Sequence, residues 1–234
     1  MKDIFGIYNM RSRISVGIIF LAPLLIHAYI LIPEIRSITS TLIISLIIYA
    51  LSGIIIIFSR MFGSKALLKC FPEGLPAQQF LMPNNSCLDK YSKERYYNFF
   101  KHKIPTFQIS KNEDEMRAQV DTSITWLISQ TRDNSKFPLI AEENMNLGFA
   151  YNLLGLKPLG ICLNLLLLFI NVITIFIHYK YHFYVNIANI VYCLIATIFS
   201  LLLWLFIITK SLVVNCGKKY ARALLSACDS PELN

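Results

Sequence analysis

Five polar side chains recur at steps of three or four residues inside a long apolar run near the carboxyl end of the chain. The run covers residues 183–208, and the five are Asn186, Asn189, Cys193, Thr197 and Ser200. Such steps keep side chains on one face of an α-helix. Repeated around a symmetric oligomer, this face would line a water-filled path, which makes the five candidate pore-lining residues. Alternatively, the same groups only hydrogen-bond to neighbouring helices and hold them together.

Two other apolar runs carry weaker versions of this pattern. Asn164 and Asn171 lie seven residues apart in the run 158–177, and the run 41–58 contains Ser45, Tyr49 and Ser52. Amide and hydroxyl side chains commonly drive the packing of membrane helices. For these two runs we therefore favour helix packing over a pore.

His27 is the one titratable imidazole deep inside an apolar run, four residues after Pro23. A proline within a helix leaves one backbone carbonyl without its donor, and a neutral histidine could bond that carbonyl or a neighbouring helix. We favour this structural role. The alternative is a gate that responds to protonation, because imidazole changes its charge near physiological pH.

Metal and redox chemistry have little support in the sequence. His178 and His182 have a metal-like spacing, but tyrosines surround them at a membrane edge, where anchoring at the interface is the better explanation. The six cysteines include no close pair of the kind that binds zinc or undergoes redox exchange. We expect no metal, no cofactor and no disulfide.

A basic and aromatic stretch, Lys90–Lys103, is the best candidate for binding an anionic ligand. Lysine and arginine can contact phosphates while aromatic rings stack on bases. The candidate ligand-binding residues are Lys93, Arg95, Lys101 and Lys103, to which we add Arg132. The competing interpretation places the helix beside anionic lipid headgroups with its aromatic side chains in the domain core.

Catalytic motifs are missing from the sequence. The segment between the second and third apolar runs has no phosphate-binding glycine loop, nucleophile elbow or zinc-hydrolase pair. Its acidic run, Glu113 to Glu115, fits the start of a helix, where the helix dipole favours negative charge. We expect no catalytic residues and no enzyme.

Four apolar runs must position these residues: 14–32, 41–58, 158–177 and 183–208. None contains Asp, Glu, Lys or Arg, and each is about long enough to cross ~30 Å of hydrocarbon. The sequence predicts four transmembrane helices in two hairpins, because the connections within each pair are short. Pro33, Glu34 and Ile35 follow the first run in place of a cleavage site, so we interpret it as a membrane helix and not as a secretory signal.

Charge placement predicts the orientation in the membrane. The net charge is +8, and the short connections carry only Arg36 and Lys180, whereas basic residues flank the other ends of the runs. By the positive-inside rule both termini and the middle segment are cytoplasmic. We therefore predict a tail and first hairpin at 1–58, a cytoplasmic domain at 59–157, a second hairpin at 158–208 and a tail at 209–234.

The cytoplasmic domain is predicted to be mainly helical, which makes the whole chain an all-α membrane protein. A helix over 88–103 should end at Ile104-Pro105, and Ser110 to Glu113 fits a capping box. Met116, Val120, Ile124 and Leu127 then form one apolar helix face. A helix over about 141–154 should stop at Gly155, before the third span begins at Pro158. The tail is expected to form an amphipathic helix at the membrane surface.

Several short motifs in the middle segment and the tail follow one another in an order that resembles one bacterial membrane-protein family. They include Gly74-Leu75-Pro76, Cys87-Leu88-Asp89, Ser92-Lys93-Glu94-Arg95-Tyr96-Tyr97, Thr131-Arg132-Asp133, Phe137-Pro138-Leu139, Gly155-Leu156-Lys157-Pro158 and Tyr220-Ala221-Arg222-Ala223-Leu224-Leu225. The resemblance covers residues 60–157 and the tail. Cys70 to Gly74 departs from the pattern, since some members have Trp-Gly-Gly there.

The family that the chain resembles is that of the four-span effectors of bacterial antiphage defence, above all the Hailong-type effector that accompanies a nucleotidyltransferase. The resemblance implies a homotetrameric ion channel in the inner membrane, held shut by a short DNA oligomer and opened on infection. The chain also resembles other four-span defence proteins, such as the Kiwa membrane subunit. A non-conducting membrane scaffold or sensor that recruits a cytoplasmic defence partner is the second hypothesis.

Overall fold

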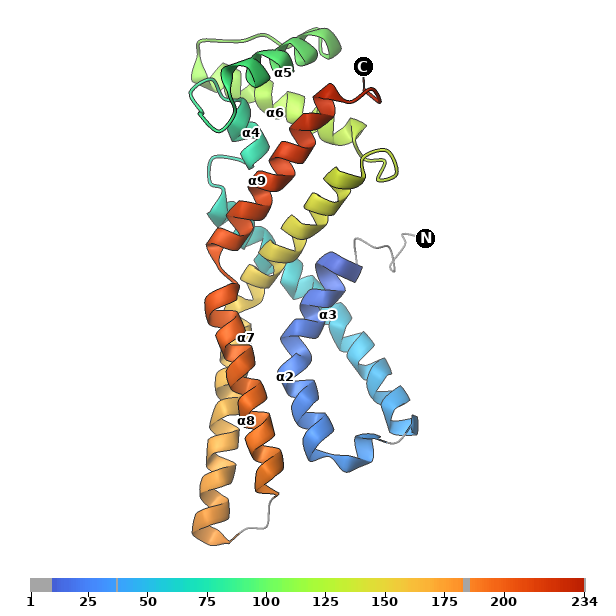
Figure 1. Cartoon of the computed structure of the whole chain (residues 1–234), viewed down its shortest axis with the longest axis vertical. Helices are drawn as coiled ribbons and strands as arrows, with labels where there is room; N and C mark the ends of the chain where they lie inside the picture. Colours follow the sequence, from blue (N-terminus) through green and yellow to red (C-terminus); the bar gives the residue numbers. More distant parts are fainter. Residues whose placement is uncertain (1–9, 37, 183–185, 234) are drawn as a thin grey trace. The chain divides into compact units, whose positions relative to one another are not determined.

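The computed structural model describes residues 10–36, 38–182 and 186–233, and the side chains among these except at 10–11, 35–36 and 38–52. Every regular element among the described residues is helical, which confirms the all-α prediction (Figure 1). The elements are η1 (Met10–Ile14), α2 (Ser15–Leu31), η2 (Pro33–Arg36), α3 (Ile38–Cys70), α4 (Pro76–Leu81), α5 (Lys90–Lys103), α6 (Glu113–Gln130), α7 (Pro138–Tyr181), α8 (Ile187–Leu202), η3 (Leu203–Ile207), α9 (Lys210–Ser226) and η4 (Ala227–Asp229).

The chain forms two compact units. Unit 1 consists of Met1–Leu67 and Gly148–Leu212, and unit 2 of Leu68–Leu147 and Val213–Asn234. The tail from Val213 onward therefore belongs with the middle segment of the chain. Helices α3 and α7 each run without a break from one unit into the other.

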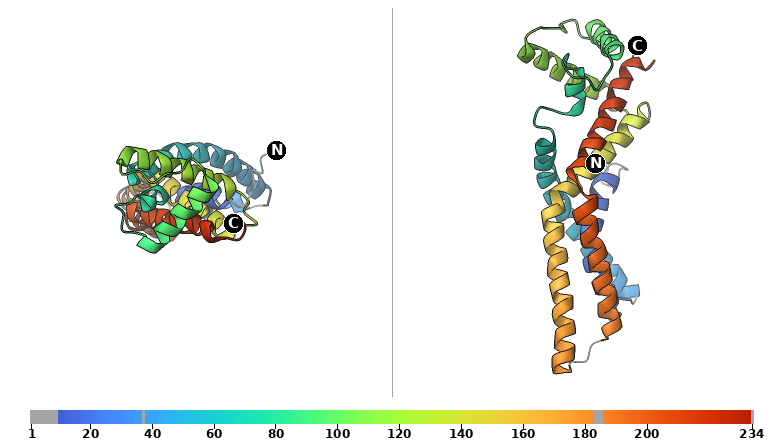
Figure 2. Two further views of the ribbon diagram at one scale, coloured as in Figure 1. Left: turned by 90° about the horizontal axis from the view of Figure 1, so that it is seen from above. Right: turned by 60° about the vertical axis from the view of Figure 1, so that its left-hand side comes forward.

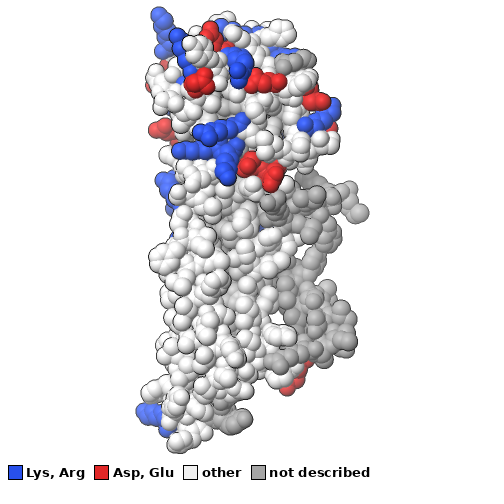
Figure 3. Space-filling model, viewed as in Figure 1, with Lys and Arg blue, Asp and Glu red and all other residues white. Residues whose placement is uncertain are grey.

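Three helical stretches are long and apolar enough to cross a membrane: Ser12–Leu31, Pro138–Tyr181 and Ile187–Ile207. They indicate a membrane protein. Figure 3 shows charged side chains gathered over unit 2, while the described surface of α7 and α8 in unit 1 carries few of them. The predicted span over 41–58 lies mostly outside the residues whose side chains are described, Ser45, Tyr49 and Ser52 included, so a fourth span stays a prediction.

The predicted end of a helix at Gly155 is wrong, whereas the predicted start of the third span at Pro158 stays a prediction. Residues 141–154 and 158–177 belong to one continuous helix, α7, and Gly155 does not end it. A Cβ at Gly155 would lie 2.4 Å from the backbone nitrogen of Gly63 in α3, so this glycine allows two helices to cross closely. Pro158, which removes one backbone donor, lies inside the helix and does not terminate it.

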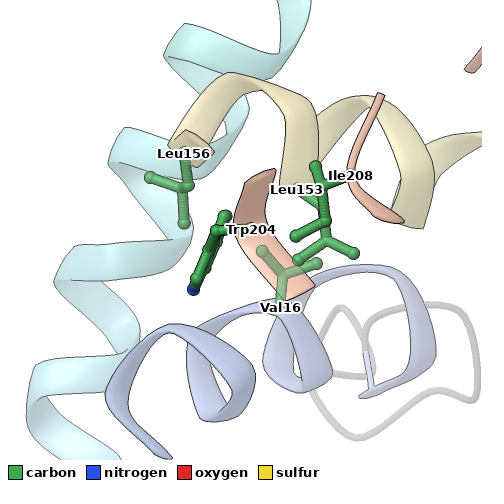
Figure 4. Close-up of a cluster of buried hydrophobic side chains, with 5 residues drawn as sticks. All are labelled: Val16, Leu153, Leu156, Trp204 and Ile208. Carbon is green, nitrogen blue, oxygen red and sulfur yellow. The ribbon is translucent and has the colours of Figure 1, made fainter. Parts of the chain in front are cut away.

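The core of unit 1 centres on Trp204, which is fully buried in the π-helical segment η3. Figure 4 shows its ring among Val16 of α2, Leu153 and Leu156 of α7, and Ile208. Gly160 of α7 lies against the ring, because a Cβ there would come within 2.5 Å of it. Helices α7 and α8 lie side by side in Figure 1 and in the right-hand view of Figure 2.

Lys157 hydrogen-bonds to backbone carbonyls at the end of the π-helical segment η3. Its Nζ donates to the carbonyl oxygens of Leu205 at 3.0 Å and of Ile208 at 2.7 Å. Carbonyls at a helix end lack intrahelical donors, and a cation is favourable there. This contact fixes α7 to the end of the α8–η3 segment inside unit 1.

Unit 2 has a core of its own. The predicted face of Met116, Val120, Ile124 and Leu127 is confirmed, since each is at most 2% exposed. Buried residues of the other helices and of the loop after α5 complete the core; they include Phe80, Leu81, Phe100, Phe107, Val213, Leu224 and Leu225. Helix α9 thus buries one face within unit 2, and its predicted place at a membrane surface is untested.

Capping explains where the helices of unit 2 begin and end. Helix α5 starts after Asp89, whose carboxylate accepts from the backbone N–H of Ser92 at 2.9 Å. Hydrogen bonds from the side chain of Ser92 and then from its backbone lower the pKa of Asp89. The predicted capping box is wrong by two residues, because Asn112 and not Ser110 caps α6. The Asn112 side chain already satisfies the first-turn amide of Asp114. Helix α6 ends at Gln130, with Thr131 as its C-cap residue.

Candidate functional site

Polar side chains from three helices meet at His27 in unit 1, where the imidazole is 6% exposed. Its Nδ1 lies 2.7 Å from the carbonyl oxygen of Pro23, and its Nε2 lies 3.1 Å from Nδ2 of Asn171 in α7 and 3.4 Å from Oγ1 of Thr197 in α8. A carbonyl can only accept, so Nδ1 carries the proton. Nε2 of the neutral ring is then an acceptor, which suits the amide donor of Asn171.

His27 bonds to a backbone carbonyl and to a neighbouring helix, but the carbonyl is not the one that the sequence predicts. A proline at position 23 deprives the carbonyl four residues earlier of its donor, which is that of Ile19. The imidazole instead binds the carbonyl of Pro23 itself, together with helix α7. The sequence prediction of a bond to the freed carbonyl is wrong, and the prediction of a bond to a neighbouring helix is confirmed.

The five candidate pore-lining residues of α8 have different environments. Cys193 and Thr197 are fully buried inside unit 1, and the Thr197 hydroxyl donates to the carbonyl of Cys193 at 2.8 Å. Asn186 is exposed and caps α8, and Asn189 lies half-buried with its Nδ2 3.5 Å from the carbonyl of Ile30. Ser200 lines an apolar groove between α2 and α8. In this arrangement the centre of the stripe faces the interior of one chain, and a pore-lining role stays a prediction.

Unit 1 contains further buried polar groups. Asn164 is fully buried; its Nδ2 donates to the carbonyl of Gly160 at 2.7 Å, and its Oδ1 has no partner in the described structure. The indole Nε1 of Trp204, Oδ1 of Asn152 and Oγ of Ser59 are likewise buried without a partner among the described residues. Buried polar atoms without partners are rare, and ordered water is the usual way to satisfy them.

The three buried asparagines of α7, Asn152, Asn164 and Asn171, are spread over much of the length of the helix. From Asn152 to Asn171 the rise along the helix is about 28 Å at 1.5 Å per residue, close to the ~30 Å thickness of a hydrocarbon core. The amide of Asn152 donates to the carbonyl of Ser12 at 3.0 Å. Sequence reasoning missed Asn152 and Trp204, the first because it lies outside the predicted spans and the second because tryptophan is more often an interfacial anchor.

Two of the predicted ligand-binding residues have partners inside unit 2. The Nζ of Lys93 donates to three backbone carbonyls, those of Met82 at 2.8 Å, Pro83 at 3.2 Å and Asn85, and burial lowers the pKa of this lysine. Lys93 thereby ties the loop after α4 to α5. Arg95 pairs with Asp229 through two contacts of 2.7 and 2.9 Å, which raises the pKa of the guanidinium.

The remaining predicted ligand-binding residues do not form one surface with these two. Lys101 and Arg132 are exposed and Lys103 is half-buried. At about 100° of rotation per residue, the four basic residues of α5 are spread around the whole helix. The structure does not collect them into one anion site, and their binding role stays a prediction.

Other candidate chemistry gains nothing from the structure. Among the described residues no group of three or more His, Cys, Asp or Glu side chains is arranged to hold a metal ion. His178 lies beside Tyr179 with ring centroids 5.2 Å apart, and both neighbouring tyrosines, Tyr179 and Tyr181, are exposed.

No known protein family, curated protein or solved structure matches this chain. The interpretation of the site therefore rests on the polar interior of unit 1.

Proposed function

We propose that this protein is a transmembrane effector of a bacterial antiphage defence system and acts as an oligomeric ion channel of the inner membrane. Both termini and unit 2 face the cytoplasm, where a nucleotide or DNA oligomer made by a partner nucleotidyltransferase controls the channel. Opening depolarises the membrane and arrests growth of the infected cell. The motif resemblance supports the defence role, the ligand and an assembly of four copies.

The observation that carries the channel proposal is the polar interior of unit 1. His27, Asn171 and Thr197 come from three helices without charged side chains in their apolar parts, and their polar atoms lie 3.1–3.4 Å from one another. Burying polar groups among apolar helices is costly unless they are hydrogen-bonded, and polar groups kept inside membrane helices commonly mark functional sites. Asn164, on the same helix as Asn171, has a buried acceptor that finds no partner among the residues that the structure describes. In the proposal these groups form the conduction path, and the bonds around His27 keep it closed.

Control by unit 2 is supported by the continuity of α3 and α7, which carry the backbone hydrogen bonds of one helix from unit 2 into unit 1. A ligand that favours one arrangement of unit 2 can shift the channel only by its difference in affinity for the open and closed states. Among the predicted ligand-binding residues, Lys101 and Arg132 are exposed on unit 2 and can meet an anion there.

Flux through liposomes that contain the purified full-length protein tests the proposal. The wild type should release potassium or sodium under at least one ligand condition, with short DNA oligomers and mononucleotides as the probes. Thr197→Val removes the hydroxyl at His27 and should change the flux. Thr174→Val is the matched control, because Thr174 bonds the carbonyl of Ile170 at 2.8 Å in the same manner but does not contact His27. Liposomes that stay impermeable under every condition would refute the channel.

A second candidate function is a non-conducting membrane scaffold that recruits a cytoplasmic defence partner. One observation favours it: Cys193 and Thr197, the centre of the α8 stripe, are fully buried within a single chain. Replacing Asn189, Thr197 and Ser200 by Leu separates the two candidates. A scaffold should keep its protective activity in infected cells with these substitutions, whereas a channel should lose its conduction and its protection together.

A further inference from the structure

One ring nitrogen of His27 has a single hydrogen-bond partner, and the other faces two possible partners. Nδ1 donates to the Pro23 carbonyl at 2.7 Å, whereas Nε2 faces both Asn171 at 3.1 Å and Thr197 at 3.4 Å. In the described part of the chain, α7 brings no charged or titratable side chain to the ring. Helix α8 brings one titratable group near it, the buried thiol of Cys193, which lies one turn before Thr197.

We propose that Nε2 of His27 is a proton-binding site and that proton uptake exchanges its partner on α7, Asn171, for its partner on α8, Thr197. The site takes a proton from water and binds it on the Nε2 lone pair. Nδ1 keeps its own proton, and no other group gains or loses one. The bound species is imidazolium, enclosed by three helices.

The exchange follows from the roles of donors and acceptors at the site. Asn171 donates its amide hydrogen to neutral Nε2, but a protonated Nε2 also donates, so the two N–H groups then oppose each other. Thr197 uses its hydroxyl hydrogen for the Cys193 carbonyl at 2.8 Å. One lone pair of the hydroxyl oxygen faces Nδ2 of Asn171 at 3.4 Å, and the second is available to accept the new N–H from Nε2, which also lies 3.4 Å away.

The geometry favours a switch over a proton wire. A wire needs a group on each side of the ring that can receive and release a proton. The Nδ1 hydrogen ends on a backbone carbonyl, which cannot pass it on. Uptake and release occur at Nε2 alone, and their effect is to weaken the link from α2 to α7 and to strengthen the link from α2 to α8. Use of this exchange as a gate rests on the proposed channel function, but the proton site itself does not.

Nitrogen-15 NMR of histidine-labelled, full-length protein in lipid nanodiscs tests the site without any requirement for activity. The chain has four histidines, so the signal that disappears in His27→Gln identifies His27. The wild type should show a neutral ring protonated at Nδ1 at high pH and a reversible change at Nε2 as the pH falls. A ring that remains neutral down to pH 4.5, or one protonated at Nε2 when neutral, would overturn the proposal.

Two variants should shift the titration midpoint in opposite directions. Asn171→Leu removes the donor to neutral Nε2 and should raise the midpoint, while Thr197→Val removes the acceptor for protonated Nε2 and should lower it. Each shift should be about half a pH unit to one unit, a three- to tenfold change in proton affinity, as expected for one hydrogen bond. Thr197→Ser and Thr174→Val should leave the midpoint unchanged. Shifts of both variants in the same direction would contradict the exchange.

Flux measurements at pH 7.5 and 5.5 show whether the site gates a channel. Ion flux of the wild type should change with the midpoint seen by NMR, and His27→Gln should abolish this pH dependence. If no variant conducts any ion but the NMR titration is as expected, the channel function fails and the proton site stands. If the wild type conducts and His27 never titrates, the proton site fails and the channel stands.

Discussion

A methyl group at Gly155 should push two helices of unit 1 apart. The Cβ of Gly155→Ala would lie 2.4 Å from the backbone nitrogen of Gly63, 2.5 Å from the carbonyl carbon of Phe62 and 2.7 Å from the Cα of Gly63. Ordinary contacts of a Cβ begin at 3.4 Å. Since all three neighbours are backbone atoms, no side-chain rotation can relieve the overlap, and α3 and α7 must separate locally by about 1 Å.

Gly155→Ala should lower the free energy of unfolding, and Gly53→Ala is the matched control. Overpacking costs about 1–3 kcal/mol, and the upper end applies when only backbone movement can relieve it. Alanine regains up to about 1 kcal/mol of helix propensity, so the free energy of unfolding should fall by about 2 kcal/mol. Gly53 in α3 has nothing within 4 Å of its Cβ position. Gly53→Ala should therefore leave stability unchanged or raise it by up to about 1 kcal/mol.

Unfolding by SDS in mixed micelles, followed by tryptophan fluorescence, measures both variants in the full-length protein. One of the chain's two tryptophans, Trp204, is fully buried in the core of unit 1 and reports on that unit. The expected order of stability is Gly53→Ala, wild type, then Gly155→Ala. If Gly155→Ala is as stable as the wild type, or if both variants lose stability equally, α3 and α7 do not cross closely at Gly155.

Three further predictions concern single side chains. Lys157→Met removes both hydrogen bonds to the carbonyls that end η3 and should lower the unfolding free energy by about 1–2 kcal/mol in the same SDS assay, with an unchanged value as the contrary result. Burial raises the pKa of the Cys228 thiol to about 12, so at neutral pH its thiolate fraction is about a thousandfold below that of an ordinary thiol. A water-soluble maleimide should therefore label the exposed Cys87 and leave Cys228 unmodified. Mass spectrometry of the peptides would show which of the two carries the label. Burial also raises the pKa of Tyr97 to about 12, so the folded state retains a proton that the unfolded state loses above about pH 10. The free energy of unfolding should therefore fall by about 1–2 kcal/mol between pH 10 and 12. In Tyr97→Phe the contribution of this residue to the fall should be absent.

Local patterns in the sequence predict much of unit 2. The face of Met116, Val120, Ile124 and Leu127 needs only the helical repeat, and the end of α5 at Lys103 needs only the proline that follows. The same local rules fail at Gly155, because a glycine that stops a helix and a glycine that admits a second helix look alike in sequence. They fail also at Lys93, whose three carbonyl partners lie in a loop eight to eleven residues earlier.

The sequence by itself determined the class of protein, because long runs without charge satisfy the requirements of a bilayer whatever their arrangement. It also singled out His27, Asn171 and Thr197 by type, since imidazole, amide and hydroxyl groups are costly among apolar residues. Only the tertiary structure decided that these three meet. The partners of His27 lie 144 and 170 residues away in the chain, and periodicity within a helix carries no information on which faces of different helices come together. The donor and acceptor roles that point to a proton-binding site come from that meeting alone.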